Sequence, residues 1–162
     1  MGTYRTAEVC PNGHVSTDSA DTQPELREKF CSKCGEPTIT QCPNCQTNIR
    51  GHYFVERVIS LRSGYESPPA FCFNCGKPFP LTERKLKAAV ELVEAGAALS
   101  ETELAQFRED LNELTKDTPQ VQVASMRLKE VMAKVGHSIA SGVRDIVVDV
   151  ISEAAKKAIS GQ

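Results

Sequence analysis

Eight side chains that can bind a metal ion lie in four short pairs in the first half of the chain. The pairs are Cys10 with His14, Cys31 with Cys34, Cys42 with Cys45, and Cys72 with Cys75. A structural zinc ion takes four ligands in a tetrahedron, so these seven thiols and one imidazole divide into two complete sites. We therefore predict two structural Zn2+ ions, with all eight side chains as ligands.

The first pair departs from the usual spacing. Gly13 stands where a second cysteine is expected, and His14 follows it. We interpret the imidazole as the replacement ligand, because a site with three ligands would be open. The alternative is a surface histidine beside an incomplete site.

Disulfide bonds are the main alternative for the thiols. They would leave one of the seven cysteines unpaired, and no signal-peptide pattern directs the chain to an oxidising compartment. No run of about 18 uncharged apolar residues predicts a membrane span. We expect a cytoplasmic protein without a transmembrane segment.

Two groupings of the four pairs use the same residues. A sequential arrangement joins the first pair to the second and the third to the fourth, whereas a cross-brace joins alternate pairs. Loop-closure entropy separates them by only about 0.5 kcal/mol for the first site. We adopt the sequential grouping because each loop can then fold locally as a zinc ribbon. Gly35 and Gly76, which directly follow two of the pairs, are expected to adopt a positive φ.

The composition changes near residue 80. Residues 1–80 contain every cysteine and most of the prolines, whereas residues 81–162 contain a single Phe and a single Pro. We predict a first zinc ribbon at 1–40, a second at 41–80 and a helical domain at 81–162. The fold class is a small metal-stabilised β region followed by an all-α region, α+β overall. The first half has too few aliphatic residues for a sizeable core, so metal must replace burial.

Short apolar segments predict strands in the first half. Residues 1–9 read as a first strand and 52–61 as a longer one, followed by a turn at Arg62-Ser63-Gly64. Phe30 is expected to lie under the first metal. The candidates for a small core are Phe54, Phe71, Phe73 and Phe79.

The second half follows a helical period. We expect a helix capped by Thr82 and ending near Gly96, and a second that starts with a capping box of Ser100 and Glu103. A third begins at Thr118-Pro119, and its apolar stripe continues in phase to Ala154. Unbroken, it would reach on the order of 60 Å, too long for the first two helices to cover.

That third helix leaves two possibilities. It breaks near Gly136 and folds back, or its distal half is buried against another chain. We favour the second, and expect a homo-oligomer formed through residues 119–160.

Two longer stretches resemble known bacterial sequences. The run from Cys10 to His14, with Lys29 to Gly35, looks like a bacterial double-zinc-ribbon pattern. Ile49 to Tyr53, with Pro68 to Glu83, is similar to a bacterial family of unknown function in which such ribbons precede a helical region. The resemblance implies the metal ligands and this architecture, and no activity.

Little in the sequence suggests catalysis. Both zinc sets are full, and there is neither a glycine-rich phosphate loop nor a His-Glu-x-x-His helix. Gly136 to Ala140 superficially resembles a nucleophile elbow, but it lies inside a helical stripe, so Ser138 is interpreted as structural. His52, the spare imidazole of the ribbon half, is interpreted as a strand residue. We expect no enzyme.

Two functions remain. The first is an interaction or adaptor protein whose ribbons dock a protein partner. The second is a nucleic-acid binder with a basic and aromatic patch of Lys29, Lys33, Arg50, Arg57, Arg62, Tyr53 and Phe54. Residues 1–80 carry eight Lys or Arg against eight Asp or Glu, and residues 81–162 carry eleven against thirteen. This balance disfavours phosphate binding, so we favour the first.

Overall fold

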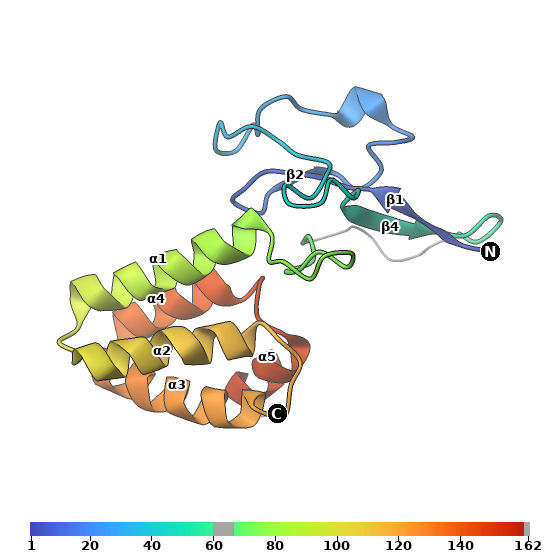
Figure 1. Ribbon diagram of the computed structural model, residues 1–162. Coiled ribbons are helices and arrows are strands. Elements are labelled where there is room, and N and C mark those ends of the chain that lie inside the picture. Colours follow the sequence, from blue (N-terminus) through green and yellow to red (C-terminus); the bar gives the residue numbers. More distant parts are fainter. Residues whose placement is uncertain (60–66, 161–162) are drawn as a thin grey trace. The chain divides into compact units, whose positions relative to one another are not determined.

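The computed structural model describes residues 1–59 and 67–160 and forms two compact units, Met1–Thr82 and Glu83–Gln162 (Figure 1). Short strands and the cysteine pairs lie in the first unit, and helices make up the second. The predicted α+β class is therefore confirmed. The turn expected at Arg62-Ser63-Gly64 lies outside the described residues.

The first unit contains two small antiparallel sheets. One pairs β1 (Thr3–Thr6) with β4 (Arg50–Phe54), and the other pairs β2 (Glu8–Val9) with β3 (Val15–Thr17). A short 3-10 helix, η1, spans Pro24–Leu26. The first strand thus pairs with a strand that lies beyond residue 40, so the segments 1–40 and 41–80 share a sheet (Figure 1).

The small core of this unit differs from the one expected. Phe79 is buried, but Phe54 and Phe73 are 38% and 54% exposed, so those two core assignments were wrong. Phe30, expected under the first metal, is 54% exposed. The side chains that are buried include Ala7, Val9, Ile49 and Leu81, together with the first cysteine of each pair. Phe30 precedes the buried Cys31 in a short extended bridge, and neighbouring side chains in such a segment point to opposite sides. Phe73 lies in the turn that joins Cys72 to Cys75.

The second unit contains four helices and most of a fifth among its described residues. They are α1 (Pro80–Gly96), α2 (Glu101–Leu114), α3 (Val121–Val135), α4 (His137–Val147) and α5 (Glu153–Ser160). Helix α3 contacts α2, α4 and α5 (Figure 1). Phe107, Leu111 and Leu114 of α2 are buried, so one apolar face of this helix points into the core. No helix in the described part of the chain is long and apolar enough to span a membrane.

The helix starts were predicted with mixed success. The capping box is confirmed, because the Ser100 hydroxyl accepts the Glu103 backbone N–H and the Glu103 carboxylate accepts the Ser100 N–H. Thr82 was wrong as a cap: α1 already begins at Pro80, a residue well suited to a first helical position. The Thr82 hydroxyl is buried and donates to the carbonyl of Ala70 at 2.8 Å.

The long third helix is broken, contrary to the favoured prediction. Gly136 separates α3 from α4 with φ of +86° and ψ of 161°, and a second break precedes α5. The distal stripe folds back, so that Val143, Val147 and Val150 are 2% exposed or less within the single chain. The physical reason for expecting a homo-oligomer through residues 119–160 therefore disappears.

Replacing Gly136 with Ala should destabilise the helical unit. The backbone at Gly136 lies in a region that is nearly restricted to glycine, and forcing another residue into it costs about 1–3 kcal/mol. An added Cβ meets no atom within 4 Å, so the effect isolates the backbone cost. Denaturant unfolding of the full chain measures it, with Ser138→Ala in the exposed first turn of α4 as the control. Equal stability of G136A and wild type would contradict this account of the break.

Candidate metal centres

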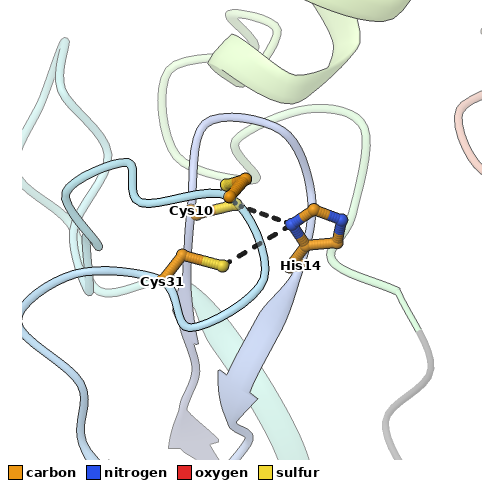
Figure 2. Close-up of side chains that lie close together, drawn as sticks. Cys10, His14 and Cys31 are labelled. Atoms are coloured by element: carbon orange, nitrogen blue, oxygen red, sulfur yellow. Dashed lines mark hydrogen bonds between the residues drawn. The ribbon is translucent and has the colours of Figure 1, made fainter.

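The first ligand cluster brings together residues that lie up to 24 positions apart in the chain. The β2–β3 hairpin carries Cys10 and His14, and the next pair comes from the loop that follows η1. Figure 2 shows Cys10 and Cys31 pointing toward the same nitrogen of His14. Each sulfur lies 3.5 Å from His14 Nδ1, and the Cys34 sulfur lies 3.7 Å from that of Cys10.

The second cluster is made of four cysteines. The sulfurs of Cys42 and Cys75 are 3.8 Å apart, and those of Cys45 and Cys72 are 3.6 Å apart. In each cluster all four ligand atoms lie within 4.8 Å of one another. The grouping is thus the sequential one, first pair with second and third with fourth.

These distances match the edges of a zinc tetrahedron. With Zn–S bonds of about 2.3 Å and Zn–N bonds of about 2.0–2.1 Å, two sulfurs lie about 3.8 Å apart and a sulfur and a nitrogen about 3.6 Å. The sulfur separations are far above the roughly 2.05 Å of a disulfide. All seven cysteines are free thiols. The donor sets, three thiols with one imidazole and four thiols, are those of structural zinc sites, and the role of the eight residues as zinc ligands stays a prediction.

Tight turns aim both members of a pair at one point. Gly35 and Gly76 have φ of +73° and +68°, as predicted. Gln46, which directly follows the Cys42–Cys45 pair, adopts the same conformation with φ of +60°. A positive φ was not expected at Gln46, because a residue with a side chain loses roughly 1–2 kcal/mol in this region and is uncommon there.

In the three pairs made of two cysteines, hydrogen bonds from the turn favour the thiolate form of the second cysteine. The backbone N–H of Glu36 lowers the pKa of Cys34 to about 6. The hydroxyl and backbone N–H of Thr47 lower the pKa of Cys45 to about 6. In the last pair, the backbone N–H of Lys77 lowers the pKa of Cys75. A thiolate is the form that binds metal.

Two of the buried first cysteines of the pairs have a raised pKa instead. Burial raises the pKa of Cys42 to about 11 and raises the pKa of Cys10, despite backbone N–H donors to both. The pKa of Cys10 in the first cluster and of Cys42 in the second is thus raised, whereas the pKa of Cys34, Cys45 and Cys75 is lowered.

Three asparagines missed by the sequence analysis also donate to cluster sulfurs. They are Asn12, Asn44 and Asn74. Each is the second residue after the first ligand of its pair, and this repetition is the sequence signal that could have found them.

The remaining candidates lie outside the clusters. His52 is half-buried in β4, and its backbone N–H donates to the carbonyl of Asp18. Ser138 is exposed near the start of α4, which follows another helix rather than a strand, so the nucleophile-elbow geometry is absent there. Of the basic and aromatic patch, Arg50, Tyr53 and Phe54 share β4, and Arg62 lies outside the described residues.

A comparison with models of protein families matches residues 3–159 to the family described as "Uncharacterized protein conserved in bacteria (DUF2321)". The match covers nearly the whole chain and includes all eight candidate ligands. No curated protein and no solved structure matches the chain.

Proposed function

The chain belongs to this uncharacterised bacterial family, and we propose that it is a non-enzymatic zinc protein whose ribbon unit docks a segment of a partner protein. The expected absence of catalysis rests on the ligand sets, because four protein ligands at each cluster leave no position for a reactive water. The stripe that suggested self-association through residues 119–160 is largely covered within the single chain.

The observation that carries the proposal is a set of exposed aromatic rings on the first unit, here called the aromatic face: Tyr4, Tyr53 and Phe73. Their side chains are 52%, 50% and 54% exposed. The rings of Tyr4 and Tyr53 lie 4.9 Å apart between centroids. Large rings exposed together are characteristic of binding surfaces, whereas scattered single ones are common on any protein.

Arg50 links this face to the second cluster. Its guanidinium lies 4.6 Å from the Tyr4 ring centroid and 3.7 Å from that of Phe73. Phe73 directly follows the ligand Cys72, so a metal bound at the second cluster would fix the position of the Phe73 ring in the aromatic face. Docking should therefore require bound metal.

A groove of about 350 Å³ runs beside these rings. It is lined by Tyr4, Arg50, Gly51, Ser67, Pro69, Phe71, Phe73 and Phe79. Among these described lining residues Arg50 is the one charged side chain. Aromatic-lined grooves bind extended, proline-containing segments.

A protein segment suits this surface better than a nucleic acid. Exposed rings beside arginines also suit stacked bases. The chain is acidic, however, with a formal net charge of −2, and metal-bound thiolates add further negative charge. A polyanion would be repelled more strongly than a peptide of low net charge.

Peptide selection on the zinc-loaded full chain tests the proposal. We expect a library of random ten-residue peptides to yield binders that share a proline or another apolar residue at one position. Phe73→Ala should abolish their binding, while Phe30→Ala should not. Phe30 is a matched control because it is also 54% exposed and adjoins a ligand cysteine of the other cluster.

Each other outcome overturns the proposal. Failure to enrich peptides, or equal loss in both variants, would remove the docking role of the aromatic face. Binding of a single-stranded oligothymidylate that weakens steeply with salt would favour the nucleic-acid function instead.

A further inference from the structure

Three of the four ligand pairs carry an asparagine at the same place. Asn12, Asn44 and Asn74 each lie two residues after the first ligand of their pair, and Lys33 occupies this place in the remaining pair. The chemistry of the neighbouring ligands explains both the three asparagines and the exception.

Each asparagine amide donates across its cluster to the opposite pair. Asn12 Nδ2 donates to the Cys34 sulfur at 3.4 Å. In the second cluster a hydrogen bond from the Asn44 side chain helps to lower the pKa of Cys75, and one from the Asn74 side chain helps to lower that of Cys45. The acceptor is in every case the last cysteine of the other pair, so the second cluster carries two reciprocal bonds.

The presence of Lys33 instead of an asparagine has a chemical explanation. An asparagine there would face the last ligand of the first pair, which is His14 rather than a cysteine. A neutral imidazole that binds a metal through Nδ1 carries its proton on Nε2, so it offers no acceptor to an amide donor. The asparagine is thus missing where a thiolate acceptor is missing.

The number of donors also follows the charge of the site. A Zn2+ ion with four thiolates carries two net negative charges and has two asparagine donors. A Zn2+ ion with three thiolates and an imidazole carries one net negative charge, and the first cluster has one asparagine donor. Amide N–H groups directed at thiolates offset this excess charge.

We propose that Asn12, Asn44 and Asn74 are positioning residues that join the two ligand pairs of each site and set how tightly the site retains zinc. Hydrogen bonds to metal ligands typically change metal affinity by about 10–100-fold. This role concerns the metal sites alone and is independent of any docking partner.

A purely conformational role is the competing explanation, because asparagine is favoured in tight turns. Substitution by aspartate separates the two. Asp keeps the shape and the turn preference of Asn, but it lacks the N–H donors and adds a negative charge beside the thiolate. If the turn matters, Asp is tolerated and Ala is harmful; if the donor matters, Asp is more harmful than Ala.

The experiment uses the full chain and measures zinc affinity by competition with a chelator, with the zinc count read by native mass spectrometry. We expect Asn44→Asp and Asn74→Asp each to weaken one of the two zinc ions by about 10–100-fold, more than the Ala variants do. Asn12→Asp should weaken the other zinc ion. Lys33→Ala is the position-matched control and should leave both affinities unchanged.

Cobalt substitution gives a second readout that a structural role would not move. Loss of an N–H donor makes the sulfur a better electron donor, so the sulfur-to-cobalt charge-transfer band of N44A should move to longer wavelength. Wild-type zinc affinity in the Asp variants, or an unshifted band in N44A, would overturn the proposal.

Discussion

Removing the metal should unfold the first unit and leave the second folded. Within Met1–Thr82 the described core consists of the cluster cysteines and a few apolar side chains such as Val9 and Ile49. Zinc binding contributes about 10–16 kcal/mol in comparable peptides, more than the stability of most small domains. Hydrogen exchange measured by mass spectrometry on the full chain should therefore show loss of protection before residue 83 after chelation.

The two clusters can be tested separately. Cys72→Ser should release one zinc ion and expose the segment around the second cluster, with the first zinc ion retained. The control is full chain that mass spectrometry shows to hold no metal. If the amide hydrogens of residues 1–59 still exchange slowly in that protein, the first unit does not depend on metal. Loss of protection in α2 and α3 would show that the helical unit depends on it too.

Truncating Phe107 should have the largest effect within the second unit. Phe107 is 1% exposed and lies on the buried face of α2, which also carries Leu111 and Leu114. Phe→Ala in such a core costs about 3–5 kcal/mol, since transfer energy is lost and a cavity remains. At about 4–8 °C per kcal/mol for a unit of this size, Tm should fall by more than roughly 10 °C.

Circular dichroism at 222 nm measures this transition, because the helices dominate that signal. Val123→Ala, on the exposed side of α3, serves as the control and should change stability by less than about 0.5 kcal/mol. A comparable Tm for F107A and V123A would mean that α2 does not form the core of this unit.

The local features of the fold were predictable because short segments determine them. The ligand spacing in Cys31 to Cys34 leads directly to a tight turn with Gly35 at positive φ. The capping box at Ser100 involves residues only three apart, so it too can be recognised in sequence. The grouping of the pairs followed from the same reasoning, since each cluster combines neighbouring pairs.

The non-local features were not predictable from pattern alone. The stripe from Val121 to Ala154 keeps its phase across Gly136, because one residue in an unusual conformation need not disturb the periodicity around it. The pairing of β1 with β4 joins residues about 50 positions apart, and neither strand has a turn signal linking it to the other. The asparagine donors were missed because their acceptors belong to another pair.

The pairing of β1 with β4 sets an order of events on the ribosome. All four ligands of the first cluster have been synthesised once Cys34 is made, whereas β4 ends only at Phe54. At about 5–20 residues per second, the first zinc ion can bind for a second or more before β1 has its partner. During that interval β1 is an unpaired edge carrying Tyr4, the kind of segment that aggregates with other nascent chains. The four ligands of the first cluster are therefore complete in the growing chain before the β1–β4 sheet can form.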